Sequence, residues 1–224
     1  RMPSDSVAAN LITAAGVPIA APSANLSGRP SPTSARHVMD DLDGRIDAII
    51  EGDDCRVGIE STVVDMTGNV PVVLRPGIIT PEQLSRVLGK TVELDPVLRT
   101  RPEIKRGQEL LETTENFKPK SPGMKYKHYA PKAEMVIYKG DRDKVLLAIT
   151  EEKFRRTECG QKVEIIMFDD DEPEIAAREF FAKLRACDKA EVDVILAAAL
   201  KEDGVGFSGM RSMIKSAGYN IVEV

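Results

Sequence analysis

The alternation of strand-like and helix-like segments in the C-terminal part of the chain constrains its fold more than any other feature. The strand-like runs are EMVIYKG, KVEIIMFDD and VDVILAAAL, and the helical patterns cover 142–156, 173–190 and the neighbourhood of MRSMIKSAG. Strands that alternate with helices in this way enter parallel sheets through right-handed crossover connections. The sequence therefore predicts a small parallel-sheet α/β domain over residues 134–224.

A second α/β pattern lies before residue 96. We expect helices at 6–15, 32–44 and 80–89, and strands at 17–21, 46–52, 61–67 and 70–77. Gly16, Gly44 and Gly89 stand where these helices end, as helix-terminating glycines do. Thr80 and Pro81 are residue types that begin a helix. The N-terminal part is therefore also predicted to be α/β.

The segment between these two patterns has the composition of a linker. Residues 93–132 show no firm periodicity and are rich in Lys, Glu, Thr and Pro. Residues 118–132 hold five lysines and no acidic residue, whereas the acidic excess of the chain, 36 acidic against 31 basic residues, lies from residue 134 onward. We divide the chain into an N-terminal part at 1–95, a basic linker or lid at 96–133 and a C-terminal domain at 134–224. Anionic ligands are expected on the first two.

Composition also argues against several classes of protein. No apolar run approaches the roughly 20 residues that cross a bilayer, and the first residues lack a signal pattern, so we expect a soluble, cytoplasmic protein without a membrane partner. Cys55, Cys159 and Cys187 are far apart and stand at no metal-like spacing from His37 or His128. We expect reduced, mostly buried thiols and no metal held by protein ligands.

Polar residues gather where three predicted strands end. Ser23 and Asn25 follow the strand at 17–21, Ser61 stands in GIESTVVD, and Arg75 stands in LRPG. Loops at strand ends bind ligands in open α/β sheets, and short hydroxyls, backbone amides and an arginine suit phosphate oxygens. The N-terminus of the following helix would add unpaired N–H groups. These residues are consistent with an anion-binding α/β domain.

Each of these residues also has a plainer interpretation. Ser23 and Asn25 suit local turn hydrogen bonds. Thr33 or Ser34 is of the type that caps a helix N-terminus, and Arg75 is suited to the surface before a turn. A serine nucleophile is disfavoured because the chain has no G-x-S-x-G motif. The residues alone leave both the turn and the anion site open.

Four motifs, in order, carry a resemblance to a known family. They are APSANLSGRPSPTSARHV, GIESTVVD, LRPG and SPGMKYKHYAPK. Together they resemble the L-threonylcarbamoyladenylate synthase family in its long form. The resemblance implies a partial YrdC-like twisted open sheet followed by a small Rossmann-like parallel-sheet domain. It matches only the later part of the catalytic domain, and the family's Lys-x-Arg segment is missing here, so we expect this chain alone to bind ATP poorly and to be inactive or nearly so.

The resemblance implies adenylation chemistry. The family condenses L-threonine with bicarbonate to a carbamate, whose carboxylate attacks the α-phosphorus of ATP, accompanied by Mg²⁺, and gives threonylcarbamoyl-AMP and pyrophosphate. The adenylate then feeds the threonylcarbamoyladenosine modification of tRNA. The expected partners are ATP, L-threonine, bicarbonate and the tRNA threonylcarbamoyl-transferase machinery, with weak tRNA binding as a further expectation.

The resemblance also assigns roles to individual residues. Ser23 and Asn25 would be catalytic and would organise the reaction centre. Contacts with ATP would come from Ser23, Ser31, Arg75, Tyr126 and Tyr129. Contacts with threonine would come from Arg1, Ala21 and Ser61. His128 would be a further contact from the linker, acting as a lid over the cleft.

Two other functions remain open on the sequence. One is the YrdC-type domain of hydrogenase maturation, which adenylates carbamoyl groups, although the HYAP linker and the trailing α/β block disfavour it. The other is a non-catalytic RNA-binding module, which the acidic C-terminal block and the 4% aromatic content disfavour. The run GVGFSGMRSMIKSAG departs from the family's usual form, which weakens any functional role for the last helix.

Overall fold

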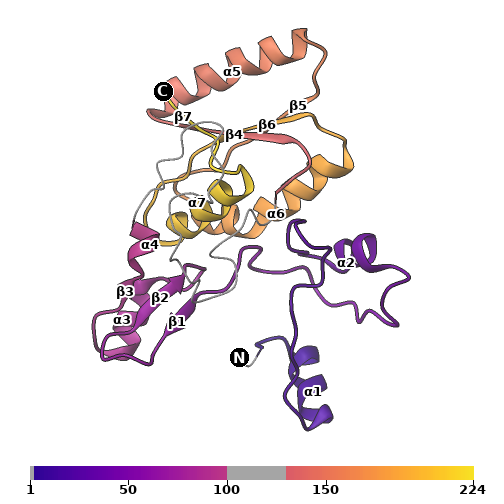
Figure 1. Cartoon of the computed structure of the whole chain (residues 1–224), viewed down its shortest axis with the longest axis vertical. Coiled ribbons are helices and arrows are strands. Elements are labelled where there is room, and N and C mark those ends of the chain that lie inside the picture. The colour runs from indigo at the N-terminus through magenta and orange to yellow at the C-terminus, as the bar shows by residue number, and fades with distance from the viewer. Residues whose placement is uncertain (1–2, 100–129) are drawn as a thin grey trace, which may run out of the picture.

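A computed structural model describes residues 3–99 and 130–224 of the chain (Figure 1). The N-terminal elements are α1 (Ser6–Ala15), α2 (Ala35–Leu42), β1 (Val63–Asp65), β2 (Val72–Arg75), α3 (Pro81–Leu88), β3 (Glu93–Leu94) and α4 (Pro96–Arg99). The C-terminal elements are β4 (Glu134–Lys139), α5 (Arg142–Glu158), β5 (Val163–Ile166), α6 (Pro173–Lys189), β6 (Val194–Ala198), α7 (Gly204–Ser216) and β7 (Ile221–Glu223). In these two ranges, no helix has the length and apolar character needed to span a membrane.

The C-terminal domain is a four-stranded parallel sheet with helices on both faces. Its strand order is β5-β6-β4-β7, and every neighbouring pair is parallel. This confirms the parallel sheet expected from the alternating pattern. β7 is an additional edge strand of three residues beside β4, too short for a periodic sequence signal.

Side chains of the central strand β4 alternate between the two faces of the sheet. Val136 and Tyr138 pack in one core cluster with α5, whereas Met135 and Ile137 pack in the other with α6 and α7. Figure 1 accordingly shows α5 on one side of the sheet and α6 and α7 on the other. Burial on both faces explains why the centre of this strand, MVIY, is a continuous apolar run.

The N-terminal part contains a smaller mixed sheet. β1 and β2 lie within the strands expected at 61–67 and 70–77 and pair in an antiparallel hairpin, and β3 pairs with β2 in parallel. Helix α3 begins with a capping box between Thr80 and Gln83 and ends at Gly89 in the left-handed conformation, as predicted. Val73 and Leu98 belong to the small core of this unit.

Two predicted strands are wrong for the described structure. Residues 17–21 and 46–52 belong to no strand, and the side chains of Val17, Ile19 and Ile50 are exposed. A strand needs a neighbour that pairs with its backbone N–H and C=O groups. Among the described residues, no segment forms a ladder with either stretch, so their apolar composition alone does not make them strands.

Two smaller predictions also need correction. Helix α2 begins after Ser34 rather than at residue 32, because Ser34 supplies the capping side chain. Cys55 and Cys159 are exposed and Cys187 is buried, so the expectation of mostly buried thiols is wrong. Cys187 is buried because it faces the sheet from α6, whereas Cys55 lies in a loop and Cys159 at a helix end.

Helices α6 and α7 form the layer where the two parts of the chain meet. Figure 1 shows the N-terminal part on the side of α6 and α7, away from α5. The backbone N–H groups of Gly58 and Ile59 donate to the carbonyl oxygen of Ala177 at 2.9 and 3.0 Å. A Cβ atom at Gly58 would lie 2.3 Å from the carbonyl oxygen of Arg178, so this approach requires glycine.

We predict that Gly58→Ala destabilises this junction by about 1–3 kcal/mol, because the methyl group forces the backbone away from α6. Gly52→Ala is the matched control, since a Cβ there meets no described atom within 4 Å. Urea unfolding of both variants measures the difference. Equal midpoints for the two variants would contradict the close contact.

Candidate functional site

The predicted site residues lie on two segments of the N-terminal part. The first segment, residues 21–34, is the loop before α2. The second comprises the loop before β1 and the end of β2, with Ser61 and Arg75. The two segments have different local structure.

The first segment is a folded loop whose shape depends on Asn25. The side-chain amide nitrogen of Asn25 donates to the carbonyl oxygens of Leu26, at 2.8 Å, and of Arg29, at 3.2 Å. Gly28 has a φ of 86°, a backbone conformation that would be strained in a residue with a side chain. The Oδ1 atom of Asn25 is buried without a hydrogen-bond partner in the described structure. The turn interpretation therefore holds for Asn25, whereas its place in an anion site stays a prediction, because the orphaned amide oxygen accepts hydrogen bonds and cannot donate one to an anion.

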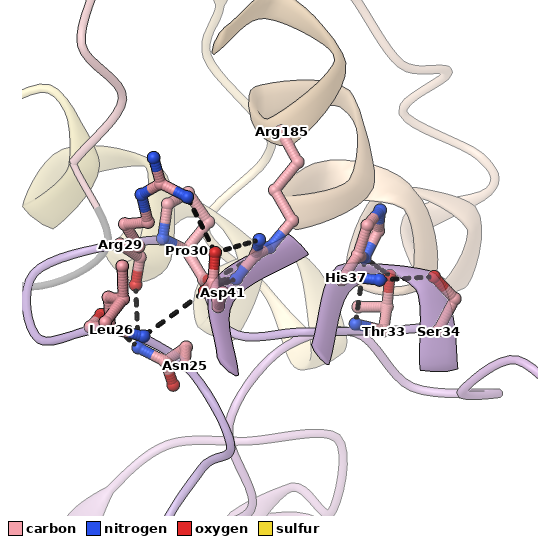
Figure 2. Close-up of polar contacts among 9 residues, drawn as sticks. All are labelled: Asn25, Leu26, Arg29, Pro30, Thr33, Ser34, His37, Asp41 and Arg185. Carbon is pink, nitrogen blue, oxygen red and sulfur yellow. Dashed lines mark hydrogen bonds and ion pairs between the residues drawn. The ribbon is translucent and has the colours of Figure 1, made fainter. Parts of the chain in front are cut away.

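A buried carboxylate anchors this loop (Figure 2). The Asp41 side chain is fully buried; its Oδ2 accepts from the backbone N–H of Leu26 at 3.2 Å, and its Oδ1 from Arg29 at 2.7 Å. Arg185 of α6 donates to both oxygens of the same carboxylate at 3.2 and 2.7 Å. Burial acts to raise the pKa of Asp41, but the hydrogen bonds from Arg185 and Arg29 outweigh it and lower the pKa to about 2.

His37 lies on α2, and its side chain contacts Thr33 of the same loop. Its Nδ1 accepts from the backbone N–H of Thr33 at 3.2 Å and lies 3.3 Å from the Thr33 hydroxyl. A ring nitrogen that accepts a hydrogen bond is unprotonated, so the neutral imidazole fits this site. Burial lowers the pKa of His37, and the charge of Arg185 adds to that effect.

The second segment pairs two of the predicted residues directly. Arg75 donates from Nε to the carbonyl oxygen of Ser61 at 3.0 Å and from Nη2 to the Ser61 hydroxyl at 3.3 Å. Gly77 is buried against the same loop, because a Cβ there would lie 2.3 Å from the backbone nitrogen of Thr62. The glycine in LRPG therefore allows the two loops to pack backbone against backbone.

Helix α7 contributes polar residues that sequence reasoning missed. Ser208 donates to the carbonyl oxygen of Gly77 at 2.7 Å, and Ser212 donates to Oε2 of Glu60 at 3.4 Å. Burial lowers the pKa of Lys215, with Arg75 adding to the effect and Glu60 opposing it. Residues 208, 212 and 215 have i, i+4, i+7 spacing, which places them on one helix face and is the signal that was available.

The remaining predicted site residues are exposed, half-buried or outside the described residues. Ala21 and Ser23 are exposed, and Ser31 is half-buried. Arg1, Tyr126, His128 and Tyr129 lie outside the described residues, so the lid stays a prediction. The described structure therefore joins Ser61 to Arg75, whereas the first segment is held by Asp41 and α6.

A cavity of about 330 Å³ lies beside the first segment, between α2 and α6. Its charged and titratable lining residues are Arg29, Arg36, His37, Asp40, Lys132, Arg185, Asp188 and Lys189. Much of this charge is already paired, as in the Arg36–Asp40 ion pair at 3.0 Å. The cavity belongs to the junction of the two parts and is not lined by Ser23 or Asn25.

Comparison with known families agrees with the two-part structure. A family model described as "Telomere recombination" matches residues 1–77, and one described as "Threonylcarbamoyl-AMP synthase, C-terminal domain" matches residues 79–218. The chain belongs to the threonylcarbamoyl-AMP synthase family. This confirms the resemblance carried by the four motifs, and with it the arrangement of a YrdC-like part and a C-terminal α/β domain.

Relatives match the chain along its whole length. It is 42% identical to the threonylcarbamoyl-AMP synthase of Pyrococcus abyssi and 38% identical to that of Bacillus subtilis, over 100% and 99% of this chain. It spans 65% and 63% of those proteins. A crystal structure of P. abyssi Sua5 complexed with L-threonine aligns with all of this chain and 65% of its own, with a TM-score of 0.83 and 42% identity.

We predict that the pKa of His37 lies below its usual 6.5. The neutral ring is favoured in the folded state, so the stability from its contact with Thr33 is present above pH 6.5 and is lost as the pH falls below that value. NMR titration of the imidazole signals measures the pKa, with His37→Gln used to assign them. A value of 6.5 or higher would contradict the acceptor role of Nδ1.

Proposed function

We propose that this chain is part of an enzyme that makes threonylcarbamoyl-AMP from L-threonine, bicarbonate and ATP. The amine of threonine and bicarbonate form a carbamate with loss of water. A carbamate oxygen then bonds to the α-phosphorus of ATP as the bond from that phosphorus to the bridging oxygen breaks and pyrophosphate leaves. The reaction needs two anions held together and their charge neutralised.

The observation that carries the proposal is the likeness to a solved relative with threonine bound. That protein is 42% identical to this chain, matches it from end to end, and has a TM-score of 0.83. The match of residues 79–218 to the C-terminal domain model of the same synthase favours this reaction over the carbamoyl-adenylating alternative. Because the chain spans 65% of that relative, we assign it part of the site.

The contact between Arg75 and Ser61 supports adjacent sites for ATP and threonine. By motif, Arg75 belongs to the ATP site and Ser61 to the threonine site. Their two hydrogen bonds, at 3.0 and 3.3 Å, fix the plane of the guanidinium group beside the serine. A guanidinium held in this way offers positive charge to a phosphate without having to order itself on binding.

The loop at 21–34 would form the phosphate side of the site. Ser23 is exposed and therefore accessible to a ligand, and its backbone oxygen accepts from Asn25 N–H at 3.0 Å. Asn25 ties the loop together from within, through its hydrogen bonds to Leu26 and Arg29. We assign Ser23 a direct contact with ATP, and Asn25 the shape of the loop around the reaction centre, with Ser31 close by in the chain.

Magnesium would enter as a companion of ATP rather than on a protein cage. Within residues 3–99 and 130–224, no group of three His, Cys, Asp or Glu side chains is arranged to hold a metal ion. The phosphates and water usually supply most ligands of such an ion, with one or two from the protein. The orphaned Oδ1 of Asn25 is of a ligand type that fits, since magnesium accepts amide oxygens. When bound, the ion would neutralise phosphate charge.

We propose that the product is consumed in the threonylcarbamoyl modification of tRNA and that the protein works in the cytoplasm beside its downstream transferase. The basic segment at 118–132, which holds five lysines, is the candidate lid and the candidate point of weak tRNA contact. Tyr126, His128 and Tyr129 lie in this segment. We also propose that residues 1–224 alone are inactive or nearly so.

We predict that the full natural chain containing these residues releases pyrophosphate from ATP only when L-threonine and bicarbonate are both present. Residues 1–224 alone should release little under the same conditions. A coupled pyrophosphate assay with each substrate omitted in turn measures both. Release indifferent to threonine would refute the enzyme proposal, and tRNA binding with a steep salt dependence and no response to ATP or threonine would favour the RNA-binding alternative.

In that full chain, we predict that Arg75→Ala lowers kcat/KM by roughly 100-fold, because a positioned charge is lost. Ser23→Ala should lower it by roughly tenfold, through loss of one hydrogen bond to ATP. The matched controls are Arg86→Ala, on the exposed face of α3, and Ser27→Ala, an exposed serine of the same loop. Steady-state kinetics give the values, and activity of Arg75→Ala equal to that of Arg86→Ala would refute the assignment.

A further inference from the structure

The loop at 21–34 is held from the other domain by one buried arginine. The Arg185 side chain of α6 is only 8% exposed. It donates from Nε and Nη2 to the carbonyl oxygen of Pro30, at 3.0 and 2.6 Å, and from Nη1 and Nη2 to the carboxylate of Asp41. Figure 2 shows this guanidinium reaching from α6 into the space between Pro30 and α2.

The chemistry of these contacts fixes position as well as distance. A guanidinium is planar and rigid, so donating to a backbone carbonyl and a carboxylate together sets their relative orientation. A buried ion pair contributes little net stability compared with apolar residues of the same size, because both charges must be desolvated. The main effect of Arg185 is therefore on where Pro30 and Asp41 lie relative to α6.

Asp41 passes this placement on to the residues assigned to ATP. Its carboxylate accepts from the backbone N–H of Leu26 at 3.2 Å, directly after Asn25. Asn25 in turn donates to the carbonyl oxygens of Leu26 and Arg29. A continuous series of hydrogen bonds thus runs from Arg185 on α6 to the Ser-Ala-Asn motif.

The same two helices also hold the second segment of the site. The backbone of α6 at Ala177 accepts from Gly58 and Ile59, just before the Glu60-Ser61 loop. Ser208 of α7 donates to the carbonyl oxygen of Gly77, at 2.7 Å. The layer formed by α6 and α7 is therefore a common support for both segments.

We propose that Arg185 is a positioning residue through which the C-terminal domain sets the ATP loop at 21–34 relative to Ser61 and Arg75. This inference rests on the proposed function, since it takes ATP as the ligand of the loop. It gives the C-terminal domain a role in the reaction without placing any of its residues on a substrate. Arg185 acts through Pro30 and Asp41.

The test uses Arg185→Ala and Arg185→Lys in the full natural chain. Arg178→Ala is the matched control. Arg178 is on the same helix, but its side chain is half-exposed and, among the described residues, forms an ion pair only with its neighbour Glu179. We expect Arg185→Ala to raise the KM for ATP by roughly tenfold or more and the KM for threonine by clearly less, because the loop that loses its anchor carries Ser23 and Ser31 of the ATP site but only Ala21 of the threonine site. Arg185→Lys keeps the charge but not the two-pronged geometry, so it should give an intermediate KM for ATP.

Hydrogen exchange separates this proposal from the proposed function. In Arg185→Ala and Arg185→Lys, the amide of Leu26 should exchange faster than in the natural chain, while amides of the central strand β4 should not. If the natural chain shows no threonine-dependent pyrophosphate release, the proposed function fails, and the positioning proposal fails with it as far as ATP is concerned. The positioning role is overturned if the natural chain is active and a folded Arg185 variant has an unchanged KM for ATP. It is also overturned if a folded variant raises the KM for ATP and the KM for threonine by the same factor.

Discussion

The buried contact of Arg185 with Asp41 and Pro30 is the interaction on which the placement of the loop at 21–34 and of α2 against α6 depends. Residues 3–57 contribute two short helices and no strand to the described structure, so their shape cannot come from a sheet. The carboxylate of Asp41 gathers donors from Leu26, Arg29 and Arg185 around one buried charge. A charge removed from water must be compensated by hydrogen bonds and an opposite charge, so the positions of these three donors around Asp41 are fixed.

The C-terminal domain supplies the rigid support that the loops of the N-terminal part lack. Its parallel sheet is covered on both faces, and the outer surface of α6 and α7 is free to contact other segments of the chain (Figure 1). That surface presents both backbone and side-chain groups, the carbonyl of Ala177 and the hydroxyl of Ser208, to the loops before β1 and after β2. The domain thereby combines a conventional core with a polar support for loops that carry the candidate site.

Local sequence rules predicted the structure correctly where a segment could satisfy its own backbone hydrogen bonds, as a helix does. They also succeeded where a pattern continued over many residues, as in the strand–helix alternation of the C-terminal domain. The helix with Thr80 as cap and Gly89 as terminator is correct because both ends are decided by residues that directly flank the helix. The strands predicted at 17–21 and 46–52 failed because strand formation requires a partner, which apolar composition does not provide. The same reasoning explains the site: motifs identified Ser61 and Arg75, and the structure joins them, whereas the contributions of Ser208 and Lys215 depend on which helix packs there.

The sequence by itself determined the family, through four motifs in fixed order, and the parallel sheet of the C-terminal domain, through an alternation that only such a sheet accommodates. It also determined where α1 and α3 end, because the glycines that terminate these helices act locally. Only the tertiary structure decided that Arg185 holds Asp41 and Pro30, more than 140 residues away in the chain. The physical reason is that a buried charge is stabilised by whichever donors the fold brings within hydrogen-bond distance, and sequence separation carries no record of that proximity.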